Sequence, residues 1–172
     1  MRRPRITREG AKYHVIARAN HKKLLMENDT VKQMFLDVLA RAHKKFDFHI
    51  DNFVIMGNHF HLIIQPIGSS SLSEIMKWIL QTFAIRYNKT NGLWGHFWGD
   101  RFFSWIIPSF SEFLRVFDYV DNNPVRAELV SSPELWKWGG IGLRRNGPPP
   151  WLQPLPGWLQ LFFPSHRLRS IT

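Results

Sequence analysis

The stretch Met56-Gly57-Asn58-His59-Phe60-His61-Leu62-Ile63-Ile64-Gln65-Pro66 decides how this chain folds. Its apolar, β-branched character predicts a β-strand that the proline closes. Because side chains alternate faces along a strand, His59 and His61 point the same way, and the hydrophobic residues between and after them point into a core. Two imidazoles on one rigid element can bind one divalent metal ion. The same His-x-His pair is also compatible with two half-exposed polar side chains.

The residues around this strand predict the other elements of the fold. Residues 48–56 form a second strand, and the Gly57-Asn58 turn joins the two strands in an antiparallel hairpin. Residues 13–19 predict a further strand, and residues 94–107 a loop and strand rich in aromatic residues. Three helices are predicted from N-terminal capping pairs: residues 30–46 from Thr30 with Gln33, residues 71–89 from Ser71 with Glu74, and residues 109–121 from Ser109 with Glu112.

The order β-α-β-β-α-β-α predicts an α+β fold, a ferredoxin-like antiparallel β-sheet with helices packed on it. The histidines are then expected on a partly open face of the sheet or near its edge. From residue 144 onward six prolines interrupt a segment rich in Trp, Leu and Phe. We therefore predict a domain of residues 1–143, with a basic N-terminal arm, and a C-terminal tail of residues 144–172 that packs on the body or is partly mobile.

Composition narrows the class of partner. The 23 Lys and Arg against 13 Asp and Glu give a formal charge of +10, which favours a polyanion, most commonly nucleic acid. A membrane surface is the alternative, but no basic amphipathic helix stands out. The absence of cysteine excludes disulfides and thiolate metal sites. Without a secretory h-region or a run of about 18 apolar residues, we expect a cytoplasmic, nucleoid-associated protein with no membrane partner.

The third predicted helix carries a second candidate group. Arg115 and Tyr119 share a helix face, and Asn123 extends their row by one turn if the helix continues to it. A tyrosine between a cation and an amide can serve phosphodiester chemistry, since the phenol can attack phosphorus, the cation can offset charge and the amide oxygen can bind metal. Tyr119 could equally lie at the boundary of the core with its hydroxyl in water.

Three motifs together resemble the HUH single-tyrosine transposase family, and most closely its REP-associated tyrosine transposase group (transposase IS200-like). The histidine strand, Met56 to Leu62, is similar to that group's Met-Pro-Asn-His-hydrophobe-His-Leu, with Gly57 in place of the proline. Trp98-Gly99-Asp100-Arg101-Phe102 is similar to its Trp-x-x-Arg-Phe. Tyr119-Val120-Asp121-Asn122-Asn123-Pro124-Val125-Arg126-Ala127 is similar to its Tyr-x-x-x-Asn-Pro-Val-Arg-Ala. The resemblance covers about residues 1–140, in the family's order.

The resemblance implies a transposase that cleaves and rejoins single-stranded, hairpin-forming DNA. It implies that His59, His61 and Asn123 hold Mg²⁺ or Mn²⁺ against the scissile phosphate. It also implies that the hydroxyl of Tyr119 attacks phosphorus, which leaves a 5′-phosphotyrosine on the enzyme and a free 3′-hydroxyl. Arg115 is a candidate for stabilising charge on geometry alone. The lone histidines elsewhere, His14 among them, are expected to have no catalytic role.

Basic and aromatic side chains are the expected DNA contacts. The candidates are Arg2, Arg3, Arg5, Arg8, Arg18, Lys22, Lys23, Trp98 and Arg101. The aromatic residues between positions 94 and 105 offer either stacking platforms for unpaired bases or ordinary core packing. Two alternatives to the strand-cleaving enzyme remain: a non-catalytic single-strand or hairpin DNA-binding protein on the same fold, and a metal-dependent phosphoesterase that uses water. The oligomeric state, monomer or dimer, is open.

Overall fold

The computed structural model describes residue 8 and residues 10–167, and its centre is the predicted hairpin. Strands β2 (Phe48–Ile55) and β3 (His59–Pro66) pair antiparallel. Strand β1 (Tyr13–Arg18) pairs antiparallel with the other side of β3, and β4 (Phe103–Ile106) pairs antiparallel with β1. The sheet order is therefore β2-β3-β1-β4. The predicted α+β, ferredoxin-like arrangement of strands is confirmed.

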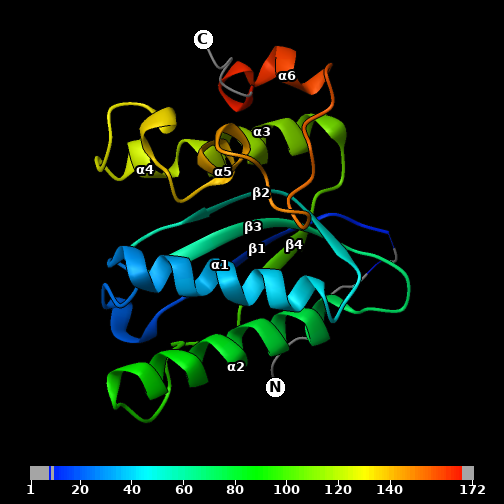
Figure 1. Ribbon diagram of the computed structural model, residues 1–172. Helices are drawn as coiled ribbons and strands as arrows, with labels where there is room; N and C mark the ends of the chain where they lie inside the picture. Colours follow the sequence, from blue (N-terminus) through cyan, green and yellow to red (C-terminus); the bar gives the residue numbers. More distant parts are fainter. Residues whose placement is uncertain (1–7, 9, 168–172) are drawn as a thin grey trace.

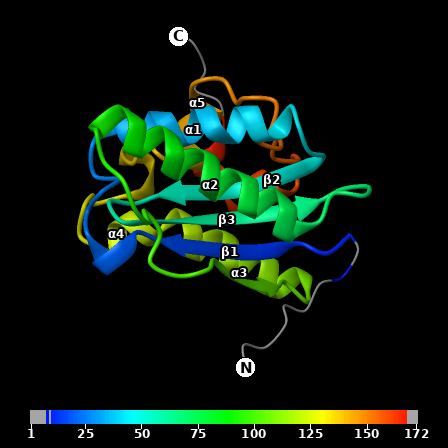
Figure 2. The ribbon, with the colours of Figure 1, turned by 90° about the horizontal axis from the view of Figure 1, so that it is seen from below.

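Helices cover both faces of the sheet (Figures 1 and 2). The long helices α1 (Asp29–His43) and α2 (Leu72–Asn91) lie on one face, and α3 (Phe110–Asp121) lies on the other, as Figure 1 shows. Short helices accompany α3: α4 (Asn123–Arg126), α5 (Gly140–Arg145) and α6 (Leu159–Phe162), with the 3₁₀ turns η2 (Pro133–Leu135) and η3 (Pro164–His166). A further 3₁₀ turn, η1 (Asn20–Lys22), follows β1. No helix in the described residues is long and apolar enough to cross a membrane.

The alternation along β3 separates two hydrophobic cores. Phe60, Leu62 and Ile64 belong to the larger core under α1 and α2. Ile63 points the other way and packs with residues of α3, including Val116 and Phe117. The histidines of β3 share the parity of Ile63, so they face α3. The sequence prediction that they point away from the main core is confirmed.

Two of the three predicted helix starts are confirmed, and one is wrong. Ser71 and Glu74 form a capping box at the start of α2, and the Ser109 side chain accepts a hydrogen bond from the backbone of Glu112 at the start of α3. Helix α1, however, begins at Asp29, because the Asn28 side chain accepts from the backbone of Thr30 at 2.7 Å. Asparagine is among the strongest N-caps and satisfies an orphan donor there. The helix also ends at His43 and not at residue 46.

A register shift in β2 places one polar residue on the α3 face. Ile50 pairs with Ile64, and Asn52 pairs with Ile63, so Asp51 is the extra residue of a β-bulge. Without the bulge Ile50 and Asn52 would share a face. With it, Ile50 joins the larger core, whereas fully buried Asn52 donates to Asp121 of α3 at 2.8 Å.

The C-terminal segment packs on the body, as predicted, and does so through a buried polar network. Trp151 and Leu152 belong to the larger core. His166 of η3 bonds Asp121 of α3 through Nε2 and Arg144 of α5 through Nδ1, both at 2.8 Å. The Arg144 guanidinium also donates to the Gln153 carbonyl. This network ties η3 to the end of helix α3. The division of the chain into two parts after residue 143 stays a prediction.

Candidate active site

The candidate site is built on neighbouring strands. Arg18 is the register partner of His59, and Ile16 that of His61, so the residues of β1 with even numbers share the face of the histidine pair. The rings of His59 and His61 have centroids 5.1 Å apart. His14 of β1 completes a row, with its Nε2 2.9 Å from Nδ1 of His61. This contact could not be predicted from the sequence, because only strand pairing brings the two rings together; that His14 has no catalytic role stays a prediction.

Burial keeps all three imidazoles neutral. Loss of solvation lowers the pKa of His14 to about 4 and is the largest cause of the fall of the His59 pKa to about 4. The charge of Arg18 lowers the His59 pKa further, and a side-chain hydrogen bond with Asn123 opposes the shift. For His61, burial, then His14, His59 and Arg18, lower the pKa to about 2. Neutral imidazole is the form that binds metal ions.

The hydrogen bonds of the Nδ1 atoms suit a metal-binding role for the histidine pair. The Asn58 side-chain oxygen lies 2.7 Å from Nδ1 of His59, and since an amide oxygen only accepts, Nδ1 carries the proton and leaves the lone pair on Nε2. When Nδ1 of His61 donates to Nε2 of His14, the lone pair of His61 is likewise left on its Nε2. Ligating histidines commonly have their second nitrogen fixed in this way.

Tyr119 lies next to His61 and His14. Helix α3 is amphipathic, and its apolar stripe of Phe113, Val116, Phe117 and Val120 is buried against the sheet. Tyr119 lies at the edge of that stripe, 36% exposed. Its ring centroid is 5.4 Å from that of His61 and 6.0 Å from that of His14. The family resemblance implied that Tyr119 and the histidines act at one site, and the fold brings Tyr119 next to His61.

A cation contacts the tyrosine, but it is not the predicted one. The Arg126 guanidinium carbon lies 5.2 Å from the centre of the Tyr119 ring. Arg115 instead forms an exposed ion pair with Glu112. The sequence predicted a cation at Arg115, one turn before Tyr119. The cation at the ring is instead Arg126 of α4. The charge-stabilising role of Arg115 stays a prediction.

Asn123 is positioned by helix α4 and not, as expected, by a continuation of α3. Helix α3 ends at Asp121, and Asn123 begins α4, so the row of Arg115 and Tyr119 does not continue along one helix. Pro124 follows at the second position of α4, where its missing N–H costs no helical hydrogen bond. The break turns Asn123 inward, where it is buried and hydrogen-bonded to His59.

The donor set fits a divalent cation. Two imidazoles suit a first-row divalent ion, and an amide oxygen with water or phosphate oxygens suits Mn²⁺ or Mg²⁺. Within the described residues there is no group of three or more His, Asp or Glu side chains placed to bind one metal ion. Asn123 is the side chain placed to add an oxygen ligand to the histidine pair.

The predicted DNA contacts are distributed unevenly around the site. Arg18 is exposed at the end of β1, and its charge acts on both His59 and His61. Lys22 and Lys23 are exposed after it, and Arg8 is exposed next to the first strand. Arg2, Arg3 and Arg5 lie outside the described residues. The DNA-binding role of all these residues stays a prediction.

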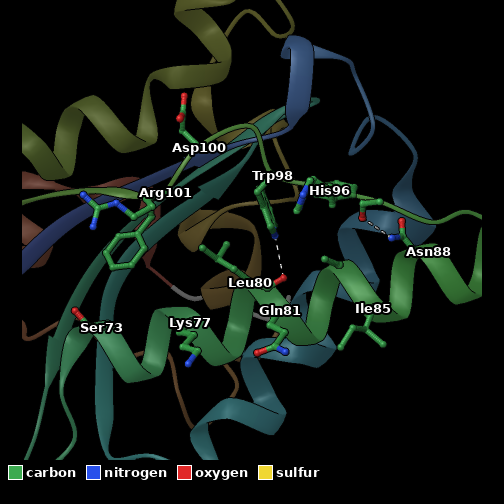
Figure 3. A pocket seen from close by; sticks show the side chains of 14 residues that line it. Ser73, Lys77, Leu80, Gln81, Ile85, Asn88, His96, Trp98, Asp100 and Arg101 are labelled. Atoms are coloured by element: carbon green, nitrogen blue, oxygen red, sulfur yellow. Dashed lines mark hydrogen bonds between the residues drawn. The ribbon is translucent and has the colours of Figure 1, made fainter. Parts of the chain in front are cut away.

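Trp98 and Arg101 lie on the opposite face of the sheet, at a cavity of about 660 Å³ between α2 and the segment before β4 (Figure 3). The Trp98 indole donates to the Leu80 carbonyl at 2.9 Å, and its ring contacts Phe60, so it is fixed as part of the core. Arg101 is exposed at the rim. The structure thus does not bring these two residues to the histidines.

A ferredoxin-like sheet that brings a histidine pair to a helical tyrosine is the arrangement expected of a single-tyrosine transposase. The chain belongs to the family described as "Transposase IS200 like", whose model matches residues 7–123.

Two solved structures are similar to the chain. One is a REP-associated tyrosine transposase bound to a REP hairpin, with a TM-score of 0.73 and 22% identity over 90% of this chain and 88% of that one. The other is a candidate transposase from Deinococcus radiodurans R1, with a TM-score of 0.50 and 16% identity over 71% of this chain and 97% of that one. No curated protein matches the chain. At these identities the likeness concerns the fold.

Proposed function

We propose that this protein cleaves and rejoins single-stranded, hairpin-forming DNA through a covalent bond between Tyr119 and a 5′-phosphate. The observation that carries the proposal is the contact of Tyr119 with His61 of the histidine pair, whose ring centroids are 5.4 Å apart. Membership of the IS200-like transposase family supports it.

The geometry suits Tyr119 as the nucleophile. Its ring is held between the imidazoles of the sheet and the guanidinium of Arg126, so the phenol is oriented yet partly open to a substrate. In the reaction the phenol oxygen bonds to phosphorus, the bond from phosphorus to the 3′-oxygen breaks, and the leaving oxygen becomes a 3′-hydroxyl. Attack by a 3′-hydroxyl reverses these changes and rejoins DNA.

Two cations are placed to assist. Arg126 lies at the Tyr119 ring and the charge of Arg18 acts on His59, and both side chains are exposed to a bound substrate. A cation beside the scissile phosphate would stabilise the charge that develops in the transition state.

His59, His61 and Asn123 would hold Mg²⁺ or Mn²⁺, which supplies Lewis-acid polarisation of the phosphate when bound. The chain's own contribution is the fixed neutral state of the two imidazoles, set by burial and by the partners of their Nδ1 atoms. Alanine at His59 or His61 should abolish divalent-dependent cleavage. Cleavage by both variants at the parent's rate would show that the site is elsewhere.

The proposed substrate is a hairpin with single-stranded flanks. The structurally similar transposase is bound to a REP hairpin, and the net charge of +10 suits a polyanion.

The decisive experiment is Tyr119→Phe, incubated with labelled single-stranded hairpins and Mn²⁺. The change removes one hydroxyl and keeps the ring, so we expect normal folding and DNA binding but no cleavage and no covalent protein–DNA band. Tyr87→Phe is the matched control, since Tyr87 is buried in α2 on the other face of the sheet. If Tyr119→Phe still cuts with multiple turnovers, water is the nucleophile and the protein is a phosphoesterase.

A further inference from the structure

Strand β4 exposes two large aromatic side chains on the face of the sheet that carries the histidines. The register partner of Trp105 is His14, and that of Phe103 is Ile16, so both rings share the face of His14 and the candidate site. The Trp105 ring centroid is 4.3 Å from that of His14. Trp105 is nevertheless 43% exposed and Phe103 66% exposed. Adjacent exposed rings of this size at the edge of a site mark a surface for interaction.

We propose that Phe103 and Trp105 form a stacking surface for unpaired bases of the DNA strand that adjoins the scissile phosphate. The inference rests on the proposed function and adds to it the form of the substrate next to the cut. Aromatic rings bind bases of any sequence through their π-faces. Trp105 joins this surface to the site, because its ring contacts His14 and His14 contacts Tyr119.

The spacing of the two side chains favours single-stranded DNA over a duplex. Residues two apart on a β-strand are separated by about 6.6 to 6.8 Å. That is about twice the rise of ~3.4 Å per nucleotide within a duplex strand. At that backbone spacing each ring can stack on its own base when the bases of an extended strand are unstacked. The bases of a duplex stem stack on one another, so their faces are covered, whereas unpaired bases leave their faces free for aromatic side chains.

The positive charge of Arg18 near the two rings also favours a DNA strand as the ligand. The even-numbered residues of β1 run from His14 through Ile16 to exposed Arg18, next to the row of Trp105 and Phe103. A strand stacked on the two rings would thus have Arg18 near its phosphates at one end. Phosphate contacts position a strand, and the rings hold its bases.

The test compares two hairpins, one blunt and one with a short single-stranded extension, by fluorescence anisotropy in the presence of EDTA. We expect Phe103→Ala to weaken binding of the extended hairpin by about tenfold, within the roughly 5- to 150-fold range for loss of one base–ring stack. Binding of the blunt hairpin should change little. Phe103→Tyr should retain the affinity of the parent, and Trp105→Ala should lose affinity in the same way as Phe103→Ala.

Phe162→Ala is the matched control, because Phe162 is 57% exposed on α6, outside the sheet. It should bind both hairpins as the parent does. Parent-like binding of the extended hairpin by Phe103→Ala and Trp105→Ala would overturn the proposal. Equal losses on both hairpins would also overturn it. The proposal would also fail if the parent is a dimer and Phe103→Ala converts it to monomers, since the rings would then belong to an interface between copies.

The outcomes separate this proposal from the proposed function. If binding depends on Phe103 and the extension but no covalent adduct forms with Mn²⁺, the stacking surface stands and Tyr119 chemistry fails. If the adduct forms and Phe103 has no effect on binding, the chemistry stands and the stacking surface fails.

Discussion

The buried network at the end of α3 is where we expect the largest effect of a single substitution on stability. His166 has no exposed side-chain surface, and its ring nitrogens bond Asp121 and Arg144. Its ring also lies 5.1 Å from that of Phe117. His166→Ala removes both hydrogen bonds and leaves a carboxylate oxygen and a guanidinium nitrogen without this partner in a buried place. A cavity remains where the ring was.

The magnitude follows from those losses. The Arg144 guanidinium can only donate, so Nδ1 of His166 accepts from it while Nε2 donates to Asp121. His166→Ala thus removes two hydrogen bonds to charged groups, each worth about 1.5–3 kcal/mol. Asp121 retains the hydrogen bond from Asn52, and Arg144 keeps its bonds to backbone carbonyls. We therefore expect a fall in the free energy of unfolding of about 3–4 kcal/mol. With a urea slope of about 2 kcal/mol per molar, the unfolding midpoint should fall by roughly 1.5–2 M.

The assay is urea unfolding followed by tryptophan fluorescence, with His21→Ala as the control at an exposed histidine. A midpoint for His166→Ala equal to that of the control would refute the reasoning. Because Asp121 lies between Tyr119 and Asn123 in the chain, the same variant should also reduce DNA cleavage. His166→Gln, which can retain one of the two hydrogen bonds, should lie between the parent and His166→Ala.

Two further predictions concern pH and salt. The folded pKa of His14, about 4, lies below its ordinary value of 6.5, so unfolded chains bind more protons between these values. His14 alone should lower stability by about 3 kcal/mol as pH drops from 6.5 to 4, and the lowered pKa values of His59 and His61 act in the same direction. Urea midpoints measured from pH 7 to pH 4 test this, and a flat profile in the metal-free protein would contradict it. DNA affinity should fall steeply as the salt concentration rises. Arg18→Gln should make the slope of log affinity against log salt concentration shallower by about one. Deletion of residues 1–8 should weaken hairpin binding without altering the fold. Salt-independent binding would exclude an electrostatic role for these arginines.

Local patterns in the sequence determined most of the fold. The period-two alternation of residues 58–65, the Gly57-Asn58 turn and the Ser71 and Ser109 caps predicted their elements because each depends on neighbours within a few residues. The same alternation predicted the shared face of His59 and His61. The resemblance of the motifs predicted the family that the comparison found.

Tertiary structure decided what lies opposite those elements. His14 meets His61 only because β1 pairs with β3, and Arg126 meets Tyr119 only because the chain turns between α3 and α4. The bulge at Asp51 shifts the register of β2 by one residue and so turns Asn52 toward α3. Strict alternation of side chains along the strand would have placed Asn52 on the other face. Local preference fixes the direction of a side chain from its own strand or helix, but the neighbour it meets depends on pairing and packing between distant segments. For this reason the sequence determined the histidine pair and the tyrosine, and the fold determined their partners.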